Sequence, residues 1–120
     1  NPEKFHLLKR DLKNNLALIK LERANLKTAG FANLDDLKLG ERVFLVGVVF
    51  EKQEPLKAVN QGIVRFFDKT RIQTNITEKY TLAGSPLFNI KGEVLGLNTI
   101  DSEGRVVAIP ISIIKEFIGI

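Results

Sequence analysis

The stretch that decides the fold is residues 72–99, which read IQTNITEKYTLAGSPLFNIKGEVLGLNT. Its second half holds two segments rich in apolar residues, Pro86–Ile90 and Glu93–Ile100, which flank the loop Asn89–Gly92. A loop that ends in glycine favours a hairpin, because the last loop residue adopts a left-handed conformation that glycine accommodates. We therefore predict a β-hairpin here, preceded by a strand over Arg71–Asn75.

In the rest of the chain, the apolar residues are again mostly spaced as in short strands. One predicted pair of strands flanks the loop Asp101–Gly104, which also ends in glycine. Glu51–Leu56 is interpreted as a charged loop, and Gly62 as a bulge or a close approach of two backbones. Many short strands predict a β-barrel or a sandwich. The further predicted strands are Lys4–Arg10, Leu16–Leu21, Arg42–Phe50, Ala58–Asp68 and Arg105–Ile109.

Two helical segments are also predicted. Apolar residues at helical spacing over Ile111–Ile118, directly after Pro110, indicate a C-terminal helix, since proline suits the start of a helix. Asn33–Asp36 is predicted to form one short helical turn with Asn33 as its cap.

Composition excludes several classes of protein. The 120 residues contain no cysteine and one histidine, His6. A disulfide scaffold, a cysteine-bound zinc and a histidine metal cluster are therefore not expected, and we predict no metal site and no cofactor. Apolar runs are too short to span a membrane. The first residue is Asn1 rather than methionine, which suggests a piece of a longer protein.

The positive charge is concentrated in the first quarter of the chain. The net charge is +4, and residues 1–30 hold seven basic against three acidic residues, whereas residues 31–120 hold eleven of each. A solvated face of paired strands and a docking surface are both compatible with this pattern. No aromatic RNA-binding motif, zinc finger or glycine-rich phosphate loop accompanies the charge, so a basic nucleic-acid-binding barrel is only a second alternative.

Several motifs resemble the HtrA/Deg family of trypsin-like serine proteases. The segments Ile72–Asn75 (IQTN), Thr81–Leu87 (TLAGSPL) and Gly92–Thr99 (GEVLGLNT) follow the order and spacing of that family's I-Q-T-D, its serine motif S-G-G-P-L and its G-E-V-I-G-I-N-T hairpin. Taken together, the matches extend over nearly the whole chain. Further segments that resemble the family are Arg10–Lys20, Gly40–Val43, Asn60–Val64 and Val107–Pro110.

The resemblance implies an all-β, trypsin-like antiparallel β-barrel with a short C-terminal helix. Residues 1–33 would be the last hairpin of the N-terminal barrel with its connector, and residues 34–120 the C-terminal barrel with its closing helix. A hairpin separated from its barrel would expose an apolar face and open edges. We therefore expect either a preceding segment or a second copy of the chain to cover it.

The resemblance also implies that the catalytic machinery has been lost. Ala83 stands at the position of the nucleophilic serine and Asn15 at that of the catalytic aspartate, while the histidine position would lie before the chain starts. Thr81 stands where the family has an oxyanion-hole glycine, so Thr81 and Ala83 would form a degenerate hole. Ser85 lies two positions past the nucleophile and is not interpreted as a substitute for it. The family's peptide-binding edge maps to Thr99, Ile100 and Asp101.

Two explanations remain open for Ala83. An experimenter can replace a catalytic serine with alanine to trap an intact protease, or evolution can discard the chemistry. Because Asn15, Thr81 and Asn75 depart from the family together with Ala83, the second explanation is favoured. The chain is then a catalytically inactive scaffold or peptide-binding module; the alternative is a genuine serine endopeptidase seen as an inactivated fragment. Family resemblance further suggests an extracytoplasmic location, periplasmic or membrane-associated.

Overall fold

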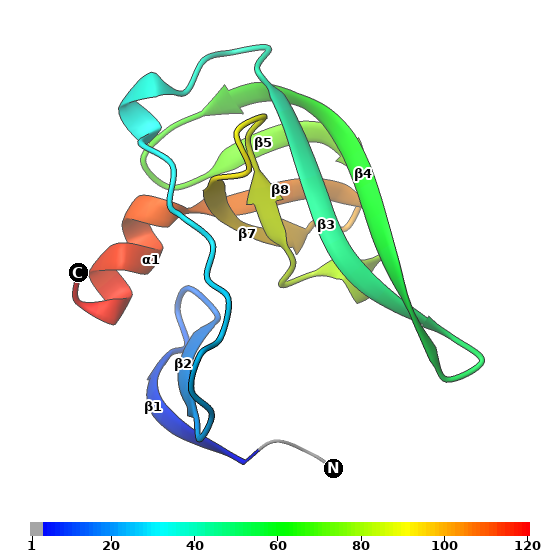
Figure 1. Cartoon of the computed structure of the whole chain (residues 1–120). Coiled ribbons are helices and arrows are strands. Elements are labelled where there is room, and N and C mark those ends of the chain that lie inside the picture. The colour runs from blue at the N-terminus through cyan, green and yellow to red at the C-terminus, as the bar shows by residue number, and fades with distance from the viewer. Residues whose placement is uncertain (1–3) are drawn as a thin grey trace.

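The computed structural model describes residues 4–120, which form a separate β-hairpin, a closed barrel and one α-helix (Figure 1). The predicted all-β barrel with a short C-terminal helix is thereby confirmed. The elements, in chain order, are β1 (Phe5–Asp11), β2 (Leu16–Leu21), the 3-10 helix η1 (Leu34–Asp36), β3 (Arg42–Glu51), β4 (Glu54–Phe67), β5 (Ile72–Thr77), the 3-10 helix η2 (Tyr80–Leu82), β6 (Pro86–Phe88), β7 (Val94–Ile100), β8 (Arg105–Pro110) and α1 (Ile111–Ile118).

The barrel closes in the strand order β3-β4-β5-β8-β7-β6, with every neighbouring pair antiparallel. Alternation along each strand sends one set of side chains into the barrel and the other outward. A Cβ at Gly62 would overlap with the Asn75 side chain, so the close approach at this glycine is to a side chain and not, as predicted, to a second backbone. The core inside the barrel includes Val43, Leu45, Val64, Ile72, Ile76, Leu87, Leu95, Val106 and Ala108.

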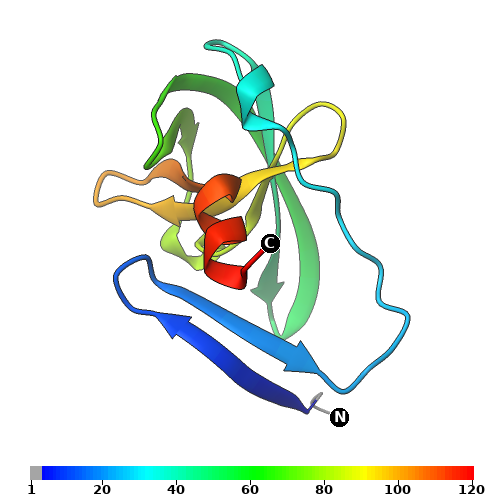
Figure 2. The ribbon, with the colours of Figure 1, turned by 90° about the vertical axis from the view of Figure 1, so that its left-hand side faces the viewer.

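The hairpin β1–β2 rests on the C-terminal helix. Leu16 packs against a second apolar cluster that contains Ile111 and Ile114 of α1. The Lys9 Nζ donates a hydrogen bond of 2.6 Å to the carbonyl oxygen of Phe117 and lies 5.4 Å from the centre of its ring. Figure 2 shows α1 directly above the hairpin and against the barrel strands. The helix therefore connects the two sheets.

The connector between the two sheets ends in the capped turn that the sequence predicts. The Asn33 side chain accepts a hydrogen bond of 3.0 Å from the Asp35 N–H at the start of η1. Just before it, the Ala32 N–H donates to the carbonyl oxygen of Val94, and the Val94 N–H donates to that of Gly30. The domain boundary between residues 33 and 34 stays a prediction.

The prediction of a charged loop over Glu51–Leu56 is wrong. Strand β4 already begins at Glu54, and only Lys52 and Gln53 form the turn, with φ values of 50° and 69°. Pro55 is tolerated within the strand because it is an edge-facing residue, so its missing N–H removes no hydrogen bond to β3. The result is a long two-stranded ribbon that extends beyond the barrel (Figure 1).

Candidate functional site

Ala83, which the resemblance assigns to the nucleophile position, lies at the end of the short helix η2. Its side chain is a methyl group with no proton to give up, and the residue is exposed. The Ala83 N–H donates a hydrogen bond of 2.9 Å to the carbonyl oxygen of Tyr80, and the preceding Leu82 N–H donates to that of Lys79. Thr81 lies inside η2 and is exposed as well. The two residues of the predicted hole therefore share one tightly wound turn.

This turn is anchored to the strand β7 and to β3. The Gly84 N–H donates to the carbonyl oxygen of Asn98 at 2.7 Å, and the Asn98 N–H donates to that of Ser85 at 2.8 Å. Gly84 has a φ of 91°, a conformation that glycine accommodates without strain. On the core side, the buried Leu82 side chain fills the space that a side chain at Gly47 would need. The position of Ala83 is thus fixed from two sides.

A hydrogen bond between the buried Asn98 and the half-buried Ser85 below the turn was not predicted. Asn98 is 1% exposed, and its Nδ2 donates to the Ser85 Oγ at 3.2 Å. The Ser85 Oγ in turn donates to the carbonyl oxygen of Leu82 at 2.6 Å. Asn98 Oδ1 is buried without a hydrogen-bond partner among the described residues. The only sequence signal was a single amide, followed by Thr99, in the largely apolar strand VLGLNTI. Ser85 therefore braces the turn rather than replacing the nucleophile.

Asn15, at the carboxylate position, lies on the separate hairpin. It has a φ of 54°, in the left-handed region that asparagine tolerates better than most residues. The turn before it is held by Asp11, which accepts hydrogen bonds from the Asn14 Nδ2 at 2.8 Å and from the Asn14 N–H at 3.1 Å. These bonds lower the pKa of Asp11 below its ordinary value. Asn15 itself is exposed and carries an amide in place of a carboxylate.

The predicted peptide-binding edge, Thr99 to Asp101, presents only one residue to a peptide. The Asp101 N–H donates to the carbonyl oxygen of Arg105, and the Asp101 carbonyl oxygen accepts from the Gly104 N–H. Because N–H and C=O groups alternate in direction along a strand, those of Thr99 point toward β8 as well. Those of Ile100 point to the opposite side, where the Asn98 groups bond to Ser85 and Gly84. Past Gly84 that side carries no further strand.

The described residues include no group of three or more His, Cys, Asp or Glu side chains that could hold a metal ion. No helix in the described part of the chain is long and apolar enough to cross a membrane. Besides Asp11, only Asp68 has a clearly shifted pKa in residues 4–120, lowered by hydrogen bonds from Thr70 and Arg71.

Residues 2–97 match the family described as the trypsin-like peptidase domain. Among curated proteins, the chain is 32% identical over 101 residues to a probable periplasmic serine endoprotease DegP-like from Halomonas elongata, over 80% of this chain and 21% of the relative. It is 34% identical over 97 residues to the protein of the same description from Pseudomonas putida strain F1, over 74% of this chain and 20% of the relative. The chain thus spans about a fifth of the length of these relatives.

A similar fold is found in the crystal structure of the serine endoprotease from Yersinia pestis. The TM-score is 0.82 at 24% sequence identity, over 98% of this chain and 43% of that one. This likeness concerns the fold alone, and it confirms that the hairpin, barrel and helix form a trypsin-like arrangement. Since the family match extends from residue 2 to residue 97 and the relatives are DegP-like, the chain belongs to the trypsin-like peptidase family, in its HtrA/Deg group.

Proposed function

We propose that this chain is a catalytically inactive HtrA-like domain that binds extended peptide segments and so serves as a scaffold or protein-binding module. The observation that carries the proposal is at Ala83. The nucleophile position holds no hydroxyl group, and its N–H is already bonded to the carbonyl oxygen of Tyr80. A serine protease needs that hydroxyl to attack and that N–H to stabilise the oxyanion.

The other catalytic positions support the same conclusion. A triad requires a carboxylate that orients the imidazole and stabilises its charged form, and the amide of Asn15 supplies no charge. Thr81 continues a 3-10 helix, so the turn directs the Ala83 N–H inward to its own backbone rather than toward a bound carbonyl. Restoring one residue would leave these other defects in place. Loss at several positions is what relaxed selection on hydrolysis would produce.

Peptide binding is proposed at the edge of β7. The N–H and C=O groups of Ile100 point to the side that β6 no longer covers. An extended peptide that forms hydrogen bonds with them would add a strand to the sheet beside Gly84. The relatives are named serine endoproteases, proteins that act on polypeptides, and a domain of this family that keeps the edge but not the chemistry would bind without cleaving.

The alternative is a genuine serine endopeptidase in which a serine belongs at position 83. The names of the relatives favour it. A serine at this position in the full-length protein separates the two accounts, because only the alternative predicts that hydrolysis returns. For both accounts we propose an extracytoplasmic location, which the naming of the relatives as periplasmic supports.

We further propose that the outer face of β1–β2 is covered in the complete assembly. Phe5, Leu7 and Ile19 share that face and are each about half exposed or more. Apolar side chains on one face of a two-stranded sheet need a partner layer. A preceding segment of a longer protein or a second copy of the chain would supply it.

The experiment compares binding of fluorescein-labelled β-casein, by fluorescence anisotropy, to the chain and to two proline variants. Ile100→Pro removes the edge-facing N–H of β7 without touching the ladder to β8 and is expected to weaken binding about tenfold. Val59→Pro removes an edge-facing N–H from β4 and is the control, with no change expected. The absence of any binding by the unaltered chain would refute the proposal.

A further inference from the structure

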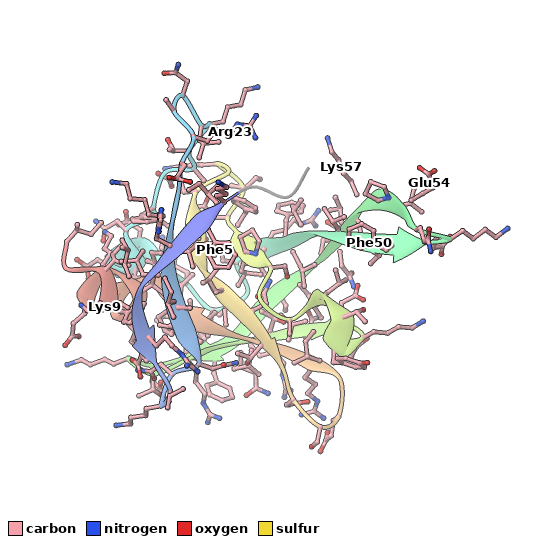
Figure 3. The ribbon with its side chains drawn as sticks, turned by 90° about the horizontal axis from the view of Figure 1, so that it is seen from below. Phe5, Lys9, Arg23, Phe50, Glu54 and Lys57 are labelled. Carbon is pink, nitrogen blue, oxygen red and sulfur yellow. The ribbon has the colours of Figure 1, made fainter. Side chains whose placement is uncertain are left out.

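The ribbon formed by β3 and β4 leaves the barrel with both of its edges uncovered. Strand β6 pairs with β3 only at Phe44 and Leu45, and β5 pairs with β4 only from Val64 onward. The ribbon itself continues in register as far as Glu51 and Glu54. Seen from below in Figure 3, Phe50, Glu54 and Lys57 lie on this ribbon, away from the hairpin that carries Phe5.

The register at the tip determines which backbone groups face outward. Glu51 pairs with Glu54 across a two-residue turn, so Glu51 and every second residue before it form hydrogen bonds with β4. The intervening residues direct their N–H and C=O groups to the other side. Those of Val48 and Phe50 therefore point outward, along the edge on which Phe44 meets β6.

The two edges of the ribbon differ in their protection. On the β4 edge, Pro55 has no N–H, Lys57 is charged, and the Gln61 N–H is already donated at 2.9 Å to the side chain of the preceding residue. Such features are how proteins prevent edge strands from pairing with other chains. The β3 edge has none of them: Val48 and Phe50 keep their N–H groups and bear apolar side chains that are 49% and 72% exposed.

The unprotected edge begins beside the Ala83 turn. Ser85 lies next to Gly47, since a Cβ at Gly47 would be 3.5 Å from the Ser85 Cβ. The free part of β3 therefore starts at Val48, directly past the turn. The helix η2 contacts both β3 and β7. The turn is thus flanked by two open edges, that of β3 on one side and that of Ile100 on the other.

We propose that the β3 edge at Val48 and Phe50 is a second peptide-binding edge, which pairs with the part of an extended polypeptide that lies beyond the Ala83 turn. This inference rests on the proposed function and names the kind of segment bound. The free N–H and C=O groups select a β-strand, because only an extended backbone presents complementary groups at matching intervals. The apolar, uncharged run from Val43 to Phe50 selects a segment with apolar side chains.

A second copy of the chain fits this edge less well than a single peptide strand. In a two-fold antiparallel pairing that joins Val48 of one copy to Phe50 of the other, Glu51 of each copy would fall beside Gly47 of its mate. The charged Glu51 side chain would then project to the same face as a side chain at Gly47, where Leu82 and Ser85 lie. A peptide can leave the edge at Val48, whereas the ribbon of a second copy must continue into its own turn.

The test measures binding of labelled β-casein to Val48→Pro and Lys57→Pro, together with the molar mass of each by light scattering. Val48 and Lys57 lie directly opposite each other in the ribbon, so each variant removes one outward N–H, from opposite edges. Val48→Pro is expected to weaken binding about tenfold and Lys57→Pro to leave it unchanged. Val48→Lys, which keeps the N–H but places a charge on the edge, is expected to weaken binding as well and covers the case in which proline prevents folding.

Each other outcome overturns the inference in a distinguishable way. If the Val48 variants bind as tightly as the unaltered chain while Ile100→Pro is impaired, the second edge is refuted and the proposed function stands. If the unaltered chain does not bind casein at all, both fail. If the unaltered chain is a dimer that Val48→Lys converts to a monomer, the edge binds a second copy and the peptide assignment is wrong.

Discussion

The backbone N–H of Ala83 donates its hydrogen bond to the carbonyl oxygen of Tyr80, 2.9 Å away and three residues earlier. A protease of this fold would need the same N–H free to bind a developing oxyanion. The bond therefore adds a feature of the backbone to the missing hydroxyl as support for the proposed loss of catalysis.

The first prediction concerns hydrogen exchange in this turn. Thr81 and Ala83 are both exposed, but of their two amides only that of Ala83 donates to a backbone carbonyl oxygen of the turn. We expect the Ala83 amide to exchange with deuterium measurably more slowly than the Thr81 amide, because exchange requires that bond to open. Amide exchange followed by NMR measures both rates in one sample, and equal rates would show that the Ala83 N–H is free.

The second prediction concerns the brace formed by Ser85. Ser85→Ala removes the hydroxyl that bonds to Leu82 and leaves the buried Asn98 Nδ2 without its acceptor. The free energy of unfolding should fall by about 1–3 kcal/mol, the cost of leaving a buried polar group unpaired. Urea unfolding measures the change. Ser112→Ala, at an exposed position of α1, is the matched control and should stay within about 0.5 kcal/mol of the unaltered chain.

The third prediction concerns the packing of β7 against β8. A Cβ at Gly96 would overlap with the carbonyl oxygen of Ile109 and lie 3.0 Å from its carbonyl carbon. Since backbone atoms cannot rotate away, Gly96→Ala should destabilise the chain by about 1–3 kcal/mol. Gly30→Ala serves as control, because a Cβ there meets nothing within 4 Å. A thermal shift equal in the two variants would mean that the strands are not packed this closely.

The fourth prediction is a pH dependence in the hairpin turn. The hydrogen bonds from Asn14 hold the pKa of Asp11 below its ordinary value of 3.8. A carboxyl group whose pKa is lowered by folding stabilises the folded state above the ordinary pKa, and this contribution is lost as the pH falls through the folded pKa. An NMR titration should therefore find the Asp11 pKa below 3.8. Asn14→Ala should raise it toward that value, and an unchanged pKa in the variant would contradict the cause given.

The motifs around Ala83 predict the barrel well because each is local. Glycine at the end of a short loop specifies a turn whatever surrounds it, and Gly92 and Gly104 do adopt positive φ values of 76° and 81°. The prediction that Pro55 closes a loop is wrong, because Pro55 lies within β4. Whether proline is tolerated in a strand depends on which side its missing N–H faces, and that follows only from the pairing with β3.

The features that the sequence could not predict depend on long-range register. Ser85 and Asn98 meet because β6 and β7 pair in one particular alignment, and thirteen residues separate them. The open edge at Val48 exists because β6 begins only at Pro86 and pairs with β3 no further than Leu45, which no local motif of β3 encodes. Residue identity predicts that catalytic groups are missing at Asn15, Thr81 and Ala83, and this stays a prediction, whereas the backbone geometry was needed to locate the open edges.

The measurement that tests the central claim most directly is cleavage of β-casein by the full-length protein with and without Ala83→Ser. The account predicts that both proteins bind casein and that neither releases fragments detectable by gel electrophoresis or mass spectrometry, because the Ala83 N–H stays bonded to Tyr80 and Asn15 supplies no charge. Release of casein fragments by the Ala83→Ser protein alone would contradict the account and identify the chain as an endopeptidase domain that lacks its nucleophile.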